Sequence, residues 1–219
     1  MRSFIDKIVE SGYKNIVFDL DGTLYDEYEF IEQAYLPVSC LLEERLHIEK
    51  SIIHDELCME WLHYGSSGNI FQNVIGKYSD FIDDSLIHCC VERYREANLS
   101  LTLPARSRRL LDFLKSNGYR LFIISDGNSA LQRRKMQVLR LNRWFQDCDI
   151  LVSGDFGKCA QKPNTIMAQQ LGLLGETKTQ TIYVGDRVCD YDFAMNCGFD
   201  FCLMKNMNAL EGNYYNGKI

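Results

Sequence analysis

The stretch Ile16-Val17-Phe18-Asp19-Leu20-Asp21-Gly22-Thr23 decides the fold. Its first residues are β-branched or aromatic, as in a buried strand, and Gly22 and Thr23 are typical of the tight turn that ends one. Side chains two apart on a strand point the same way, roughly 6.6 Å apart along it, so Asp19 and Asp21 can address one ligand. The stretch predicts a buried strand with two carboxylates at its carboxyl end.

Four further apolar runs of the same kind follow, at residues 121–124, 150–152, 181–184 and 199–203. Segments whose apolar residues recur at helical spacing separate the second, third and fourth runs from what precedes them. Strands alternating with helices are typical of a parallel sheet that helices cover on both faces. We therefore predict an α/β fold with a doubly wound parallel sheet.

Residues 26–103 break this alternation, because they contain no convincing strand. Their apolar residues recur at helical spacing, for example at Phe30, Ala34, Val38 and Leu42. Pro104 marks the return to the α/β pattern. The sequence thus predicts a core formed by residues 1–25 and 104–219, interrupted after its first strand by a helical insertion of residues 26–103.

Polar side chains suited to chemistry stand close to the ends of the later predicted strands as well. They are Ser125 and Asp126 after the second strand, Lys162 before the fourth, and Asp186 and Asp190 after it. Ligands of open parallel sheets bind beyond the carboxyl ends of the strands. These residues are therefore predicted to share one rim with the two carboxylates of the first strand.

Asp19 and Asp21 have the spacing of a nucleophile and a proton carrier. An aspartate with an ordinary pKa of about 3.9 is ionised at neutral pH, so Asp19 can attack phosphorus and form an acyl phosphate. Asp21, slightly further out, can protonate the leaving oxygen and then deprotonate the attacking water. The pair predicts transfer of a phosphoryl group.

An anionic nucleophile that meets an anionic phosphate needs a cation between them. Asp186 supplies a carboxylate for Mg²⁺, which prefers oxygen ligands, and Asp190 can hold a metal-bound water or steady the site. Ser125 can donate its hydroxyl to a phosphoryl oxygen, and Lys162 can neutralise charge on the transferring group. We therefore expect Mg²⁺ as the cofactor.

These motifs, in this order, resemble the four motifs of the haloacid dehalogenase-like (HAD) hydrolase superfamily, and the resemblance covers nearly the whole chain. It implies a Rossmann-like core in which Asp19 is the nucleophile and Asp21 the general acid and base. The helical insertion resembles the type 1 cap of that family, which closes over the site and selects substrate. The expected substrate-binding residues are Ser125, Asp126 and Lys162. The expected metal ligands are Asp19, Asp21, Asp186 and Asp190.

The chain departs from the family pattern at two positions. Asp126 stands where asparagine is commoner, which adds negative charge beside the phosphate site. Lys158 competes with Lys162 as the phosphate-binding lysine, and we favour Lys162 because Pro163 and an apolar helix follow it.

Composition limits the partners. The 219 residues include 24 Lys and Arg against 30 Asp and Glu, a net charge of −6, without the long basic run that a nucleic-acid-binding surface needs. The short basic cluster Arg133-Arg134-Lys135 is interpreted as a solvated helix face. No apolar stretch approaches the roughly 18 residues of a membrane span. The nine cysteines form no CxxC pair, which argues against a disulfide framework or a zinc site. Cysteines of this kind are typical of a reducing compartment, so we expect a cytoplasmic protein.

The leading functional hypothesis is a Mg²⁺-dependent phosphatase that hydrolyses a small phosphorylated metabolite, either a sugar phosphate or a nucleoside monophosphate. Relatives that displace halide from carbon have no leaving alkoxide to protonate, so Asp21 argues against that reaction. Two alternatives stay open. One is a phosphomutase of the same fold, and the other is a protein that binds a phosphorylated ligand without turnover.

Overall fold

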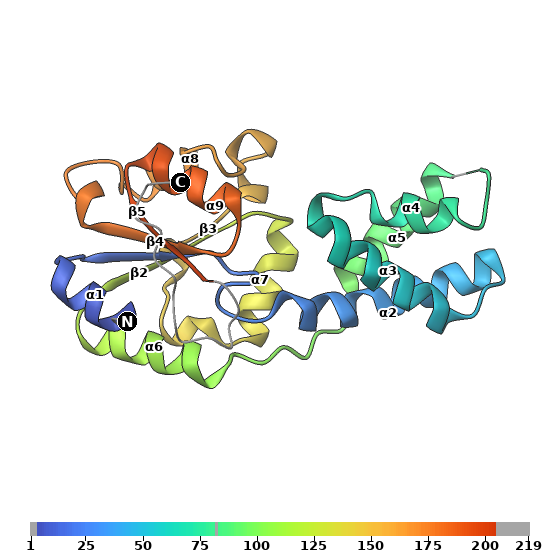
Figure 1. Ribbon diagram of the computed structural model, residues 1–219, viewed down its shortest axis with the longest axis horizontal. Helices are drawn as coiled ribbons and strands as arrows, with labels where there is room; N and C mark the ends of the chain where they lie inside the picture. Colours follow the sequence, from blue (N-terminus) through green and yellow to red (C-terminus); the bar gives the residue numbers. More distant parts are fainter. Residues whose placement is uncertain (1–3, 82, 205–219) are drawn as a thin grey trace. The chain divides into compact units, whose positions relative to one another are not determined.

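The computed structural model describes residues 4–81 and 83–204 (Figure 1). The chain divides into two compact units, one formed by Met1–Glu27 with Leu101–Ile219 and the other by Tyr28–Ser100. The boundaries predicted from the sequence, after residues 25 and 103, lie a few residues from this division.

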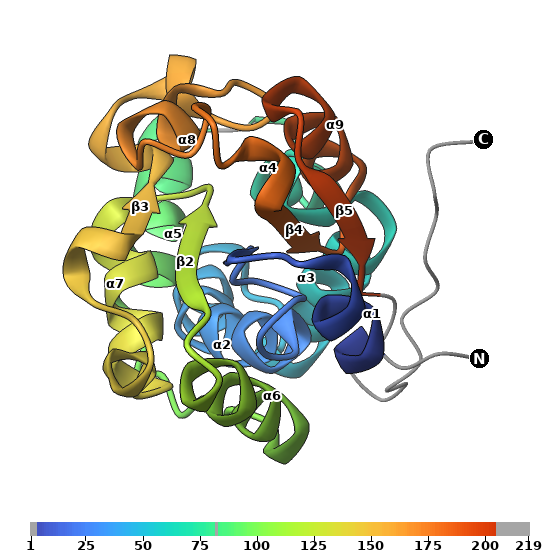
Figure 2. The same cartoon turned by 90° about the vertical axis from the view of Figure 1, so that its left-hand side faces the viewer.

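A five-stranded sheet organises the first unit (Figure 2). All neighbouring strands are parallel, and their order across the sheet is β3-β2-β1-β4-β5. The strands are β1 (Asn15–Phe18), β2 (Arg120–Ser125), β3 (Ile150–Val152), β4 (Thr181–Gly185) and β5 (Asp200–Leu203). Each strand coincides with or overlaps an apolar run that the sequence marks, and the predicted α/β fold with a parallel sheet is confirmed.

The register brings the functional strand ends together. Phe18 at the end of β1 pairs with Ile123 of β2 and with Val184 of β4. The backbone N–H of Asp19 continues this ladder, because it donates to the Val184 carbonyl at 2.9 Å. The residues after β1, β2 and β4 therefore leave the sheet at the same edge.

Helices cover both faces of this sheet (Figures 1 and 2). α1 and α6 lie on one side of it and α8 and α9 on the other. The helices of this unit are α1 (Phe4–Ser11), α6 (Ala105–Ser116), α7 (Ser129–Val138), α8 (Ile166–Gln170) and α9 (Val188–Cys197). Short 3-10 turns span Leu141–Arg143, Asp147–Asp149, Ser153–Asp155, Lys158–Ala160 and Lys178–Gln180.

The core between the sheet and α8 and α9 is apolar and buried. Its buried side chains include Val17, Phe122, Ile124, Met167 and Phe193. Each large apolar side chain buried in this way contributes roughly 1.5–3 kcal/mol to folding. This buried core fixes the strands whose ends carry the polar residues of the site.

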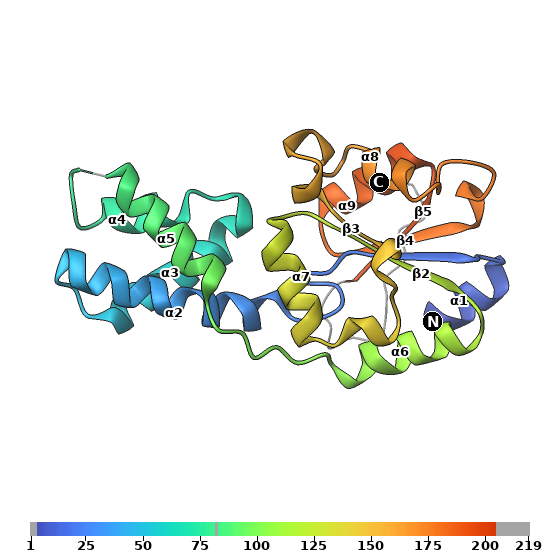
Figure 3. The ribbon, with the colours of Figure 1, turned by 180° about the vertical axis from the view of Figure 1, so that it is seen from behind.

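The second unit is helical, as the sequence predicts for the insertion (Figure 3). It contains most of α2 (Glu27–Leu46), with α3 (Lys50–Tyr64), a 3-10 turn at Gly65–Ser67, α4 (Ile70–Gly76) and α5 (Asp84–Glu96). Aromatic rings join these helices, since Tyr94 of α5 stacks edge-on with Phe30 of α2, their centroids 5.3 Å apart, and with Phe71 of α4. Across residues 4–81 and 83–204, no helix has both the length and the apolar character that a membrane crossing requires.

Candidate active site

Asp19 sits at the centre of the site, directly after β1. Its side chain is 7% exposed, and Oδ1 accepts a hydrogen bond from Lys162 Nζ at 2.7 Å. Burial raises the pKa of the Asp19 carboxyl, Lys162 opposes that rise, and the nearby carboxylates of Asp190, Asp21 and Asp186 add to it. A cation among these carboxylates would favour their ionised, nucleophilic forms.

Lys162 is buried between acidic partners. Its ammonium contacts Asp190 Oδ1 as well as Asp19, lies 3.1 Å from the Tyr183 hydroxyl, and is 3% exposed. Burial by itself would lower the pKa of Lys162, but Asp19, Tyr183 and Asp190 hold it well above the ordinary value. Lys162 therefore carries a fixed positive charge beside the nucleophile.

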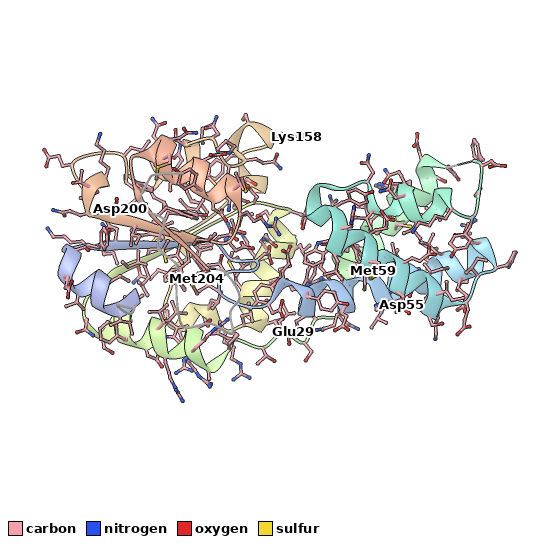
Figure 4. The ribbon with its side chains drawn as sticks, viewed as in Figure 1. Glu29, Asp55, Met59, Lys158, Asp200 and Met204 are labelled. Atoms are coloured by element: carbon pink, nitrogen blue, oxygen red, sulfur yellow. The ribbon has the colours of Figure 1, made fainter. Side chains whose placement is uncertain are left out.

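The rival lysine lies elsewhere. Lys158 is exposed at the start of the 3-10 turn Lys158–Ala160 (Figure 4). The structure thus brings Lys162, and not Lys158, to the carboxylate of Asp19.

Asp190 is fully buried and makes contacts through both of its oxygens. Oδ2 accepts from the backbone N–H groups of Asp186 and Arg187, each at 3.1 Å, which caps the start of α9. Oδ1 faces the Lys162 ammonium and the Tyr183 hydroxyl. Asp190 therefore holds both the Lys162 ammonium and the loop that carries Asp186.

Three carboxylates form a group that suits a hard metal ion. One ligand oxygen each from Asp19, Asp186 and Asp190 lies within 4.8 Å of the others. Burial raises the pKa of Asp186 to about 7, which a bound divalent cation would reverse. Asp21 does not belong to this group, so metal ligation by its side chain stays a prediction.

Gly22 allows the chain to turn close beside this group. Its φ of +73° lies in the left-handed region, and a Cβ atom there would stand 2.3 Å from Asp186 Oδ2. Glycine at this position therefore lets the turn after β1 pass closer to Asp186 than a residue with a side chain would allow.

The Asp21 carboxylate accepts from three separate donors. Lys135 Nζ donates to Oδ1 at 2.8 Å, the Tyr25 hydroxyl also contacts Oδ1, and Gln132 Nε2 donates to Oδ2 at 2.7 Å. Burial by itself would raise the pKa of Asp21, but the charge of Lys135 and these hydrogen bonds hold it below its ordinary value. The side chains around Asp21 therefore favour its ionised form.

The interpretation of Arg133-Arg134-Lys135 as a solvated face is wrong for Lys135, which is 3% exposed. Gln132 is equally buried, at 2%. The signal was present in the helical spacing, because Gln132 and Lys135 stand on the same face of α7 as the buried residues Leu131 and Met136. Three consecutive basic residues suggest an exposed helix face, and this is why the helical spacing of Lys135 was not used.

The two remaining predicted residues follow β2. The buried Ser125 hydroxyl accepts a hydrogen bond from Gln132 at 2.8 Å. Both oxygens of Asp126 accept from the backbone N–H of Lys162 at 3.2 Å. Asp126 therefore anchors the loop that delivers Lys162, and its direct contact with substrate stays a prediction.

Comparison with known proteins gives a consistent result. A family model described as haloacid dehalogenase-like hydrolase matches residues 16–204. A glyceraldehyde 3-phosphate phosphatase from Methanocaldococcus jannaschii is 30% identical over 186 residues, which are 80% of this chain and 77% of that protein. A phosphoglycolate phosphatase from Aquifex aeolicus is 26% identical over 185 residues, which are 84% of this chain and 80% of that protein. A solved HAD-superfamily hydrolase from Geobacter sulfurreducens shares the fold, with a TM-score of 0.66 at 19% identity over 87% of this chain and 86% of its own.

Proposed function

The chain belongs to the haloacid dehalogenase-like hydrolase family, and from this premise we propose that it is a phosphatase that hydrolyses small phosphate monoesters through an aspartyl phosphate on Asp19. The contact between Asp19 Oδ1 and the buried Lys162 ammonium, with Asp21 held by separate donors two residues further on, carries the proposal. The phosphatase names of the two relatives support it.

The first half of the reaction moves the phosphoryl group to the protein. A carboxylate oxygen of Asp19 forms a bond to phosphorus, and the bond between phosphorus and the ester oxygen breaks. The ester oxygen keeps the electron pair and takes a proton from the Asp21 carboxyl. Although Lys135, Tyr25 and Gln132 favour ionised Asp21, a negatively charged phosphoryl group beside it favours uptake of that proton.

The second half releases the phosphate. Water attacks phosphorus and gives a proton to the Asp21 carboxylate, while the bond between phosphorus and the Asp19 oxygen breaks. The products are inorganic phosphate and a regenerated Asp19 carboxylate. Lys162 and the Ser125 hydroxyl stabilise negative charge on the phosphoryl oxygens in both halves.

The cluster of three carboxylates from Asp19, Asp186 and Asp190 fits Mg²⁺, because their oxygens are hard ligands that lie within 4.8 Å of one another. When bound, the ion would supply the positive charge that lets an anionic nucleophile approach an anionic phosphate. Asp19 and Asp186 would hold it, and Asp190 would fix the loop of Asp186.

Chelation tests the metal dependence. We expect hydrolysis of 4-nitrophenyl phosphate to fall by roughly 100-fold or more after dialysis against a chelator and to recover when Mg²⁺ is added, because positive charge at this site offsets the repulsion between anions. Isothermal titration should show that the metal-free protein binds Mg²⁺, and that Asp186→Asn weakens this binding. Full activity in protein shown by elemental analysis to hold no metal would contradict the Mg²⁺ proposal.

The substrate is best sought among sugar phosphates and nucleoside monophosphates, with glyceraldehyde 3-phosphate and phosphoglycolate added because the relatives carry those names. Release of inorganic phosphate from one of them would identify the substrate class. Formation of an isomeric sugar phosphate without phosphate release would instead establish the phosphomutase alternative. That the helical unit Tyr28–Ser100 selects among such substrates is part of this proposal and rests on the resemblance of the insertion to a type 1 cap.

A further inference from the structure

One side-chain amide, that of Gln132, contacts both the expected proton carrier Asp21 and the expected phosphate-binding hydroxyl of Ser125. Gln132 Nε2 donates to Asp21 Oδ2 at 2.7 Å and to Ser125 Oγ at 2.8 Å, and it lies 3.1 Å from the Asp126 carbonyl. Gln132 comes from α7, while Asp21 follows β1 and Ser125 ends β2. The side chain thus joins three separate segments of the site.

The start of α7 is built to bring this side chain in. Asn128 caps the helix, since its side-chain oxygen accepts from the backbone N–H of Leu131 at 3.1 Å. Gly127 precedes it with a φ of +136°, and a Cβ atom there would meet Cγ and Cδ of Gln132 at 3.3 Å. The loop therefore leaves room for Gln132, one turn into the helix, to reach Ser125 at the end of β2.

The direction of these hydrogen bonds matters for ligand binding. The amide is the donor, so it makes the Ser125 oxygen an acceptor and leaves the hydroxyl proton for another partner. The Ser125 hydroxyl donates a long hydrogen bond of 3.5 Å to the Asp126 carbonyl, which also accepts from the Gln132 amide at 3.1 Å. A bond at this limiting distance is weak, so the hydroxyl proton can turn to a phosphoryl oxygen when one arrives.

The same amide fixes the orientation of Asp21. With Gln132 on Oδ2 and Lys135 on Oδ1, the carboxylate is held at both oxygens by residues of one helix. A proton carrier has to lie within hydrogen-bond reach of the leaving oxygen, so this orientation decides whether the proton transfer can occur.

We propose that Gln132 is a positioning residue that aims the Asp21 carboxyl at the leaving oxygen and the Ser125 hydroxyl at the phosphoryl group. The inference rests on the proposed phosphatase function. It goes beyond that function in assigning the alignment of two catalytic groups to one side chain of α7.

Two esters that differ in their need for a proton test the assignment. 4-Nitrophenyl phosphate releases a stable phenolate, whereas glycerol 2-phosphate releases an alkoxide that has to be protonated. The test compares kcat/KM for both esters in the wild type, Gln132→Met and Gln137→Met. Gln137 is an exposed glutamine of the same helix, so its variant is the matched control.

We expect Gln132→Met to lower kcat/KM for both esters, because the Ser125 hydroxyl loses its orientation. The loss should be about tenfold larger for glycerol 2-phosphate, which depends on Asp21 as a proton donor. Gln137→Met should leave both values unchanged. A second variant, Gln132→Asn, keeps a buried amide that is one methylene short, so it protects folding and should shift the ratio of the two values in the same direction.

The outcomes separate this inference from the proposed function. A folded Gln132→Met variant that retains the wild-type ratio of the two kcat/KM values would overturn the inference alone. A wild-type protein that releases phosphate from neither ester, nor from the sugar phosphates, nucleoside monophosphates, glyceraldehyde 3-phosphate and phosphoglycolate named above, with Mg²⁺ present, would overturn the proposed function, and the inference with it.

Discussion

Replacement of Asp19 by Asn should lower hydrolysis of 4-nitrophenyl phosphate on the order of 10³-fold or more, because an amide oxygen cannot attack phosphorus in place of the carboxylate. The two side chains have nearly the same shape. Lys162 also keeps its contact with Asp190, so the fold should survive. Initial rates and a thermal melt of the same preparation measure the two quantities.

Asp192→Asn is the control for this variant. Asp192 is an exposed residue of α9, and the same chemical change there should leave the rate unchanged. A folded Asp19→Asn protein that keeps the original rate would show that another group is the nucleophile.

Lys162→Met should have the second large effect, and it should reach both stability and activity. The variant leaves Asp19 and Asp190 buried without their cation, and removal of one partner from a buried ion pair costs about 3–5 kcal/mol. We expect about 3 kcal/mol, because the two carboxyl groups can take up protons and so relieve part of the cost. Hydrolysis should fall by roughly 100-fold or more, since the phosphoryl group loses a fixed positive charge.

Urea unfolding and initial rates check this expectation, with Lys158→Met as the control. Lys158 is exposed, so its loss should change neither quantity appreciably. If Lys158→Met removed activity while Lys162→Met retained it, the assignment of the phosphate-binding lysine would be reversed.

The elements that could be predicted from the sequence are those with a local signal. The strand before Asp19 contains the apolar run Ile16-Val17-Phe18 because both of its faces are covered, and that burial is visible in the residues themselves. The places of Asp19, Ser125 and Asp186 at one edge follow from parallel pairing alone.

The contacts that could not be predicted depend on which groups meet across the fold. Asp190 is predicted as a metal ligand, and it does lie in the group of three carboxylates, but the sequence does not show that its oxygens also accept from backbone N–H groups and from Lys162 of a distant loop. Lysine side chains are rarely buried unless they are paired with an opposite charge, so the sequence alone favours an exposed Lys135. Only the fold shows that Asp21, 114 residues away, provides the pairing charge.

The central claim is that Asp19 receives the phosphoryl group. It is tested most directly by mixing the protein with 4-nitrophenyl phosphate and Mg²⁺, quenching in acid within the first turnovers, and measuring the masses of the peptides. The account expects one added phosphoryl group on the peptide that carries Asp19, and none on that peptide from Asp19→Asn. Turnover by the wild type with no phosphorylated peptide at any quench time, or with the phosphoryl group on a different residue, would contradict it.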